Sequence, residues 1–180
     1  MIGQDGPDFL MGGTGNDVLI GGSGKDVFMG GNGNEVMLGG TSDSIFVAGT
    51  GNDVMEGGSG SDLFLIGTGH DVITGGGGMD TFKFTSATGA ESRITDFTPG
   101  ADQIDLTSAF GYVNITAQNW TKFVEVVPQS PTATTGFLEI SPNGNGNFHV
   151  LAQLDGPAFQ MVNGQAQSAL SYNDFILPSH

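Results

Sequence analysis

The chain has 180 residues, which is long enough for one domain or for two small domains that share an interface. Its formal net charge is −15, from 19 acidic residues against four basic ones, and such a chain should repel nucleic acid and anionic membrane surfaces. The absence of cysteine excludes disulfides and thiolate metal sites. No apolar run approaches the length of a membrane span, and no basic and then apolar signal peptide opens the chain.

A nine-residue repeat runs through the first half without an insertion. Its pattern is G-G-x-G-x-D-x-U-x, where U is an apolar residue. Nine units span residues 3 to 83, beginning with the weaker copy GQDGPDFLM and continuing as GGTGNDVLI, GGSGKDVFM, GGNGNEVML, GGTSDSIFV, AGTGNDVME, GGSGSDLFL, IGTGHDVIT and GGGGMDTFK. Because the apolar residues are periodic, we expect a folded chain that needs a counterion rather than a disordered acidic one.

The first six positions of each unit predict a turn that gathers oxygen atoms. Glycine permits positive φ and close approach of neighbouring backbones, so that carbonyl oxygens can converge. Carbonyl and carboxylate oxygens together suit Ca²⁺, which accepts six to eight ligands, better than Mg²⁺, which demands strict octahedral geometry. The alternative is a solenoid whose aspartates merely cap turns. The sixth-position carboxylates are Asp8, Asp17, Asp26, Glu35, Asp53, Asp62, Asp71 and Asp80.

The last three positions of each unit predict a short strand with an inward apolar side chain. Side chains of a strand alternate between its two faces, so the eighth position of every unit should point to the same core. The residues there are Leu10, Leu19, Phe28, Met37, Phe46, Met55, Phe64, Ile73 and Phe82.

The nine in-phase copies resemble the calcium-binding repeats of the RTX family. The resemblance implies an all-β fold: a right-handed parallel β-roll in which two units form one coil of 18 residues, and each calcium lies between two stacked turns. One edge would then carry Asp8, Asp26, Ser44, Asp62 and Asp80, and the other Asp17, Glu35, Asp53 and Asp71. The implied backbone ligands belong to Gly12, Thr14, Gly21, Ser23, Gly30, Asn32, Gly49, Gly51, Gly58, Gly60, Gly67, Gly69, Gly76 and Gly78.

These positions are unequal. Ser44 replaces a carboxylate and Ser42 replaces a glycine of the same unit, so the two sites beside Ser44 are in doubt unless Asp43 compensates. Glu35 keeps the charge but is one methylene longer, which predicts distorted sites on both of its sides. The best pairs are Asp53 with Asp71 and Asp62 with Asp80. We expect about five bound calcium ions.

The segment after Lys83 resembles the region that follows the β-roll in serralysin-type proteases and other type I secreted RTX proteins. The matching residues are I-x-D-F at 94–97, Gly100, Asp102 and I-D-L at 104–106. Ser92 stands where the family usually has Asp. Asp96, Asp102 and Asp105 are either further calcium ligands or residues of turns and strand edges around Pro99-Gly100, and both interpretations stay open.

The rest of the second half predicts a β cap. Residues 135–154 read as two strands around an Asn- and Gly-rich turn. The ending, ALSYNDFILPSH, is similar to the C-terminal ends of RTX proteins, where an uncleaved export signal lies. We therefore divide the chain into a β-roll over 3–83 and, over 84–180, an antiparallel β cap or sandwich that carries the secretion signal.

The outer face of one predicted sheet is unusually apolar. It carries Val27, Met29, Ile45, Val47, Leu63 and Leu65. Such a patch needs a cover or a partner. We expect the C-terminal half to cover it; the alternative is a docking face for an upstream domain or a second copy.

No catalytic motif is present. His70, His149 and His180 are scattered, and there is neither an H-E-x-x-H zinc helix nor a G-x-S-x-G elbow. The G-x-G strings lack a following helix and basic residues for a dinucleotide. Trp120 and the phenylalanines are most simply core residues. We expect no enzymatic activity.

The resemblance predicts a calcium-triggered folding module at the C-terminus of a larger protein. Such a protein is exported unfolded by a type I secretion machinery and folds as a monomer outside the cell or at its surface. The alternative is an extracellular binding module: an adhesin end-domain, a polysaccharide-binding accessory module, or an ice-binding roll. Thr14 with Asn16 and Thr50 with Asn52 suit an ice-binding row, but Thr68 is paired with His70.

Overall fold

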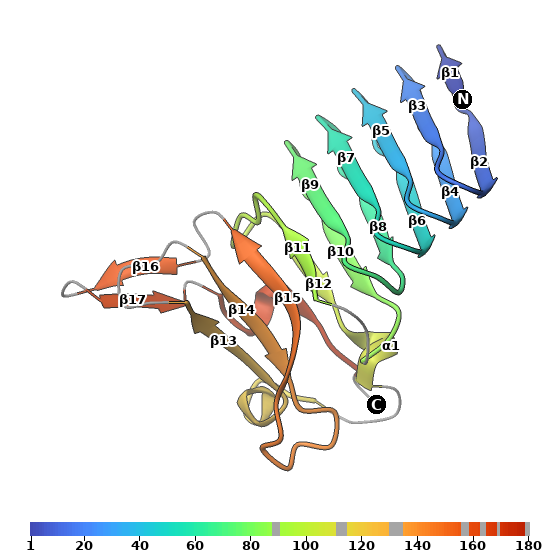
Figure 1. Ribbon diagram of the computed structural model, residues 1–180. Helices are drawn as coiled ribbons and strands as arrows, with labels where there is room; N and C mark the ends of the chain where they lie inside the picture. The colour runs from blue at the N-terminus through green and yellow to red at the C-terminus, as the bar shows by residue number, and fades with distance from the viewer. Residues whose placement is uncertain are drawn as a thin grey trace.

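The computed structural model describes residues 1–87, 91–110, 115–129, 135–155, 159–162, 165–168 and 170–178. Within these residues the strands form two long sheets and a hairpin (Figure 1). The first sheet contains, in spatial order, β1 (Ile2–Gln4), β3 (Val18–Gly22), β5 (Val36–Gly40), β7 (Val54–Gly58), β9 (Val72–Gly76), β11 (Ser92–Ile94), β15 (His149–Asp155), β14 (Thr135–Ile140) and β13 (Val124–Pro128).

The second sheet runs beside the first. Its strands in spatial order are β18 (Phe175–Ile176), β12 (Gln103–Asp105), β10 (Thr81–Phe84), β8 (Leu63–Ile66), β6 (Ile45–Thr50), β4 (Val27–Asn32) and β2 (Phe9–Thr14). The remaining elements are the hairpin β16 (Phe159–Val162) and β17 (Gln165–Ser168), helix α1 (Thr107–Phe110) and the 3₁₀ turns η1 (Trp120–Lys122) and η2 (Tyr172–Asp174). None of the helices in the described segments is long and apolar enough to cross a membrane.

Parallel pairing follows the predicted period of 18 residues. Phe28 of β4 pairs with Phe46 of β6, and Met37 of β5 pairs with Met55 of β7. The strands are longer than three residues, because they continue into the first two glycines of the next unit. Gly31, for example, pairs with Gly49. Glycine allows this continuation, since a Cβ on Gly49 would lie 2.2 Å from the carbonyl oxygen of Gly31.

The core lies between the two sheets, as the repeat predicts. Every eighth-position side chain from Leu10 to Phe82 is at most 1% exposed. In the second sheet, the rings of Phe28, Phe46, Phe64 and Phe82 form a stack with centroid separations of 4.6, 4.8 and 5.3 Å. Phe97 closes this stack beyond Phe82, with the two ring centroids 6.0 Å apart.

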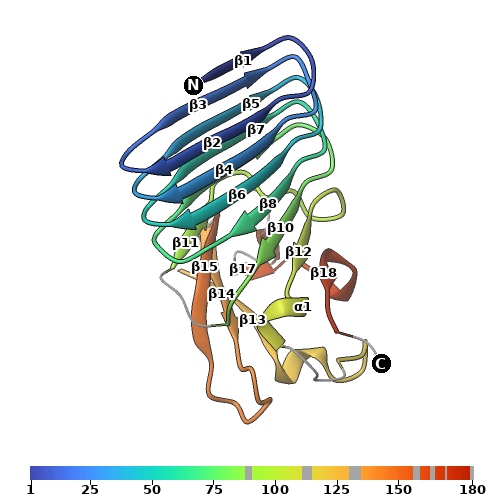
Figure 2. The same ribbon diagram turned by 90° about the vertical axis from the view of Figure 1, so that its right-hand side faces the viewer.

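The C-terminal half extends both sheets at the β9 and β10 end of the roll (Figures 1 and 2). Strand β11 pairs in parallel with β9 on one side and with β15 on the other, and β12 lies between β10 and β18. Beyond β15 the pairing becomes antiparallel, through β14 to β13. Strands β14 and β15 confirm the two strands predicted around the Asn- and Gly-rich turn.

The apolar outer face is not covered by the C-terminal half. The described part of that half continues the ends of the sheets instead of lying over β4, β6 and β8, so the expectation of a cover was wrong (Figure 2). Ile45 is 39% exposed, while Val27, Met29, Val47, Leu63 and Leu65 are half-buried among their neighbours. Docking of an upstream domain or a second copy on this face stays a prediction.

Candidate metal centres

Stacked turns are joined by hydrogen bonds between sixth-position residues 18 apart. Where the next residue in the row is an aspartate, the backbone N–H of one residue donates to its carboxylate; Asp26 donates instead to the hydroxyl of Ser44, and the carboxylate of Glu35 accepts no such bond. Asp8 donates to Asp26 Oδ1 at 2.9 Å, and Asp62 donates to Asp80 Oδ1 at 2.9 Å. On the other edge, Asp53 donates to Asp71 Oδ1 at 3.0 Å. The structure therefore arranges these residues in the two predicted rows: a first row of Asp8, Asp26, Ser44, Asp62 and Asp80, and a second row of Asp17, Glu35, Asp53 and Asp71.

The second oxygen of most carboxylates in the rows is their unusual feature. Among the described residues, buried side-chain oxygens without a hydrogen-bond partner are Oδ2 of Asp8, Asp17, Asp26, Asp53, Asp62 and Asp71, and both Oε atoms of Glu35. A buried carboxylate oxygen without a donor is costly unless a cation lies beside it. The repeated orphan oxygen is therefore the observation that a cation best explains.

The glycine turns leave space beside these oxygens. A Cβ on Gly57 would lie 2.3 Å from Asp62 Oδ2 and 2.6 Å from the carbonyl oxygen of Gly75 in the next stacked turn. A Cβ on Gly21 would lie 2.1 Å from Asp26 Oδ2. Any side chain at these glycines would fill the space that the oxygens border. A hard cation with oxygen ligands, such as Ca²⁺, fits this donor set.

The carbonyl groups named by the resemblance lie at the strand ends and in the turns that follow them, and only some of them are free of hydrogen bonds. The carbonyls of Gly21 and Gly30 face the first glycines of the preceding stacked turns, Gly3 and Gly12. The carbonyl of Asn32 instead accepts a hydrogen bond from the N–H of Gly15 at 2.9 Å. The carbonyl of Gly49 likewise accepts one from the N–H of Thr68.

Backbone oxygens are essential to any such site. Within the described residues, no three side chains of His, Asp or Glu come together in a way that could hold a metal ion. Two carboxylates per site, at most, leave several of the six to eight oxygens of calcium to be supplied by carbonyls or water.

Burial makes the carboxylates hard to ionise. It raises the pKa of Asp62 and Asp71 to about 6 and that of Asp80 to about 7. Burial, the adjoining side chain of Asp53 and the charge of Asp17 together raise the pKa of Glu35 to about 7. Neighbouring carboxylates that must share a desolvated edge favour either protonation or a bound cation.

The Ser44 position lacks an available oxygen. Its Oγ donates to the carbonyl of Ser42 at 3.2 Å and accepts the N–H of Asp26 at 3.3 Å. Asp43 does not take its place, because its carboxylate lies on the exterior and pairs with Lys25 at 2.6 Å. The hydrogen bond from Lys25 lowers the pKa of Asp43.

Each of the three candidate ligands after the repeat, Asp96, Asp102 and Asp105, accepts hydrogen bonds at both of its carboxylate oxygens. Asp96 accepts the N–H groups of Gly75 at 2.9 Å and Gly76 at 2.8 Å. Asp102 accepts those of Asp80 at 3.0 Å and Thr98 at 2.8 Å. These contacts favour the interpretation as turn residues, although Asp102 also continues the first row by one position.

Asp105 is neutralised by a different partner. Lys83 Nζ lies 2.6 Å from its Oδ2, and the hydroxyl of Thr107 donates to Oδ1 at 2.6 Å. Burial acts to raise the pKa of Asp105, but Lys83 and Thr107 outweigh it and lower the pKa. In the second row, Ser92 continues the turn by accepting the N–H of Asp71 at 3.3 Å.

Asp174 is a structural residue that the sequence analysis missed. It is 4% exposed, and its Oδ1 accepts the N–H of Gly100 at 2.6 Å while Oδ2 accepts the N–H of Ser171 at 2.6 Å. The contact joins positions 74 residues apart, and no repeat or motif relates them. The closing D-F motif was visible in the sequence, but its partner was not.

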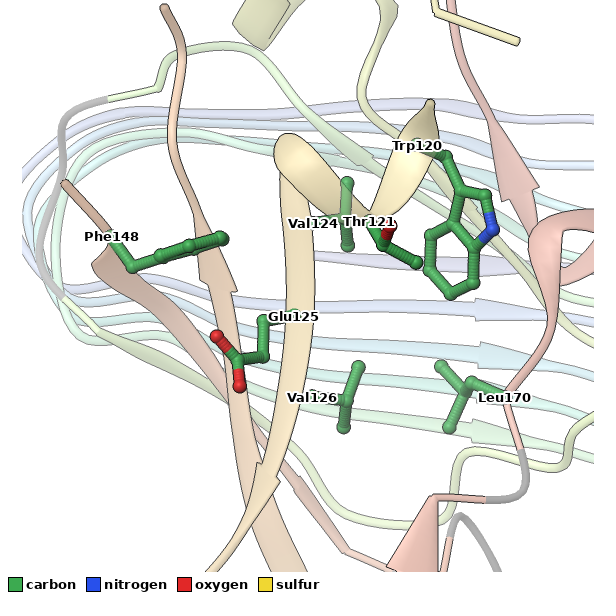
Figure 3. A pocket seen from close by; sticks show the side chains of 7 residues that line it. All are labelled: Trp120, Thr121, Val124, Glu125, Val126, Phe148 and Leu170. Atoms are coloured by element: carbon green, nitrogen blue, oxygen red, sulfur yellow. The ribbon is translucent and has the colours of Figure 1, made fainter. Parts of the chain in front are cut away.

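A separate cavity of about 330 Å³ lies in the C-terminal half, and its lining is mostly apolar (Figure 3). Trp120 lines this cavity and packs against Phe175, with the ring centroids 5.6 Å apart. The polar lining groups are Thr121 and Glu125. With one carboxylate, the lining does not reproduce the oxygen sets of the repeat turns. The lining residues are Trp120, Thr121, Val124, Glu125, Val126, Phe148 and Leu170.

Comparison with known proteins agrees with this geometry. A family model described as RTX calcium-binding nonapeptide repeat (4 copies) matches residues 2–34, 29–64 and 67–83. The solution structure of the AlgE6R3 subunit from the Azotobacter vinelandii mannuronan C5-epimerase is similar, with a TM-score of 0.56. The similarity covers 91% of this chain and 78% of that one at 22% sequence identity, and it concerns the fold alone. No curated protein is significantly similar in sequence.

Proposed function

Because the first half of the chain consists of RTX calcium-binding nonapeptide repeats, we propose that the protein is a calcium-triggered folding module. In this proposal, residues 3–83 are the calcium-binding roll and residues 84–180 are its cap. The role is structural rather than catalytic. The row of buried carboxylate oxygens without partners is the observation that carries the proposal.

The folding step follows from the charge of the rows. Without a cation, stacked carboxylates repel one another and glycine-rich turns have few side chains to hold them together. Binding of Ca²⁺ supplies the missing partner, so its binding free energy becomes folding free energy. Cytosolic calcium is low and extracellular calcium is near millimolar, so the chain would stay unfolded inside the cell and fold outside.

We extend the proposal to export by a type I secretion machinery, with a parent protein upstream and a monomeric, extracellular or cell-surface product. The resemblance of the C-terminal ending supports this extension. The ending includes β18, which pairs with β12 at the end of the second sheet. A signal that becomes a sheet strand on folding would be accessible to the export machinery before folding.

Circular dichroism of the whole chain tests the folding step. We expect little β signal in excess EGTA and a cooperative gain of β signal with millimolar Ca²⁺, whereas Mg²⁺ at the same concentration substitutes poorly. A chain that is fully folded in EGTA, with an unchanged melting temperature on addition of calcium, contradicts the proposal.

An extracellular binding module is the second candidate, favoured by a regular polar row along one edge. The N–H of Asn34 donates to Asn16 Oδ1 at 2.9 Å, and the N–H of Asn52 donates to Asn34 Oδ1 at 2.8 Å. These bonds hold successive exposed side chains in one orientation. Polysaccharide-binding and ice-shaping assays on the calcium-loaded protein distinguish the two candidates, since a folding module alone gives neither signal.

A further inference from the structure

Glu35 departs from the carboxylate pattern of the rows. It lies in the second row between Asp17 and Asp53 and is 1% exposed. Its own N–H donates to Asp53 Oδ1 at 2.8 Å, as in the other turns. Its carboxylate accepts no hydrogen bond, however, and both Oε1 and Oε2 are buried without a partner. Glu35 therefore has two unpaired oxygens where Asp53 and Asp62 have one each.

The longer side chain explains the difference. A Cβ on Gly30 would lie 3.0 Å from Oε2 of Glu35, which places this oxygen beside the first glycine of its unit, as Asp62 Oδ2 lies beside Gly57. A Cβ on Gly33 would lie 2.8 Å from Oε1. Oε1 therefore does not accept a backbone N–H as Oδ1 of Asp53 does, and it lies beside Gly33, the fourth residue of the same turn.

Each oxygen also has a backbone carbonyl nearby. The Cβ position of Gly30 lies 2.3 Å from the carbonyl oxygen of Ala48, and that of Gly33 lies 2.0 Å from the carbonyl oxygen of Gly15. Carbonyl oxygens of the preceding and the following stacked turn therefore border the same spaces as the two oxygens of Glu35. Such a dense set of acceptors without a donor is unfavourable in the absence of a cation.

We infer that Glu35 supplies both carboxylate oxygens to calcium in its turn, which makes this turn the most selective for Ca²⁺ over Mg²⁺. The inference rests on the proposed function, because it assumes that the turns bind calcium. Calcium accepts bidentate carboxylates and six to eight ligands, whereas Mg²⁺ requires a near-ideal octahedron and retains its waters. Glu35 is then an additional ligand oxygen rather than the distortion that its length suggested.

Vibrational spectroscopy gives a direct test. The full chain is labelled with ¹³C at the glutamate carboxylates, which separates their stretching bands from those of the aspartates. Of the five glutamates, only Glu35 lies at the sixth position of a repeat. We expect the labelled antisymmetric carboxylate stretch to shift to lower frequency on calcium addition, as it does for bidentate carboxylates. The shift should be absent in labelled Glu35→Asp and retained in labelled Glu56→Asp.

Metal competition gives the second readout. Glu56 is exposed on β7, so Glu56→Asp removes the same methylene outside the turns and serves as the matched control. We expect Glu35→Asp to raise the calcium concentration at the midpoint of folding. This increase should be roughly three times larger in excess Mg²⁺ than without Mg²⁺. Glu56→Asp should show the same midpoints as the unmodified chain.

The outcomes separate the two proposals. If the unmodified chain shows no calcium-dependent folding, the proposed function fails. If it folds with calcium but the labelled band does not shift, or if Mg²⁺ affects Glu35→Asp and the unmodified chain equally, the assignment of Glu35 is overturned and the proposed function stands. If Glu35→Asp does not fold, the shift of the labelled band in the unmodified chain still tests the assignment of Glu35.

Discussion

The backbone N–H of Asp62 donates a 2.9 Å hydrogen bond to Oδ1 of Asp80, 18 residues further along the chain, while Oδ2 of Asp62 is buried without a partner. One carboxylate oxygen thus joins two turns in register, and the proposed function assigns the other to a cation. Asp53 and Asp71 repeat this division in the second row. Under the proposed function, strand register and metal binding depend on the same side chains, so the loss of one carboxylate should impair both.

Substitutions in the first row should have unequal effects. Asp62→Ala removes the acceptor for the N–H of Ser44, a 2.7 Å bond, together with a free oxygen. We expect a loss of about 1.5–3 kcal/mol in the stability of the calcium-loaded fold, the range for a hydrogen bond to a charged group. Asp71→Ala, in the second row, should have a similar effect, because it removes the acceptor for the N–H of Asp53. Chemical denaturation in saturating calcium measures the loss.

Ser44→Ala is the control for this row. The hydroxyl makes only long contacts, at 3.2 and 3.3 Å, and supplies no carboxylate. We expect a change of less than about 1 kcal/mol and an unchanged calcium midpoint. Equal losses of stability in Ser44→Ala and Asp62→Ala would contradict the different roles of a serine and a carboxylate in this row.

Two glycines of one turn provide a matched steric test. A Cβ on Gly75 would lie 2.3 Å from Asp80 Oδ2, whereas a Cβ on Gly77 would meet nothing within 4 Å, and neither residue has a positive φ. Gly75→Ala should displace the carboxylate and raise the calcium midpoint clearly. Gly77→Ala should leave the midpoint unchanged or stabilise the fold by about 0.4–1 kcal/mol, because alanine restricts the unfolded chain. Similar midpoints for the two variants would show that the space beside Gly75 has no role.

The repeat made most of the roll predictable. Its period of 18 residues predicted both that Phe28 pairs with Phe46 and that Asp62 contacts Asp80. The resemblance named the carboxylates, but it did not show which of their oxygens are free. That property depends on side-chain length, as Glu35 demonstrates, and on donors from other segments, as the N–H groups of Gly75 and Gly76 on Asp96 demonstrate.

The cap was predictable only in its local elements. The antiparallel pairing of β14 with β15 follows from a turn between neighbouring strands. The parallel pairing of β15 with β11 and the contact of Asp174 with Gly100 join segments that no period relates. Such contacts depend on packing against the end of the roll, so the sequence pattern of either segment alone cannot reveal them.

Without calcium, lowering the pH should favour folding. In the folded chain the pKa of Asp62 and Asp71 is raised from 3.8 to about 6, and that of Asp80 to about 7. The folded state then binds more protons than the unfolded state between these values. This contribution to stability is fully present below the unfolded pKa and is lost as the pH rises through about 6 to 7. Circular dichroism in EGTA should show β signal gained between pH 8 and pH 5.

Calcium should reverse the sign of this dependence. The cation binds the ionised carboxylates, so protons compete with it and the calcium midpoint of folding should rise as the pH falls below about 7. A β signal that decreases on acidification in EGTA would show that burial does not control the ionisation of these groups.

The contact between Asp174 and Gly100 should stabilise the cap. Asp174→Ala removes the buried carboxylate that accepts the N–H of Gly100 and of Ser171, and both of these hydrogen bonds are partly buried. We expect a loss of about 1–3 kcal/mol on chemical denaturation in calcium. Trp120 packs against Phe175, the next residue, so its fluorescence should report this loss directly. An unchanged fluorescence transition would place the C-terminal strand outside the cooperative unit.

The cap itself should be required for the roll to fold. A chain that ends at Lys83 would lose β11 and β12, the strands that pair with the exposed edges of β9 and β10. It would also lose Asp102, the acceptor for the N–H of Asp80, and Phe97, which covers the ring of Phe82. Open strand edges and an uncovered core end invite association. Nine small units bury little area each, so the cap holds a large share of a marginal total stability.

We therefore expect the truncated chain to need more calcium and to fold incompletely or to associate, whereas the full chain is monomeric. Calcium titration by circular dichroism with light scattering measures both properties. A truncated roll that is monomeric and folds at the same calcium concentration would assign the second half to export or partner binding alone.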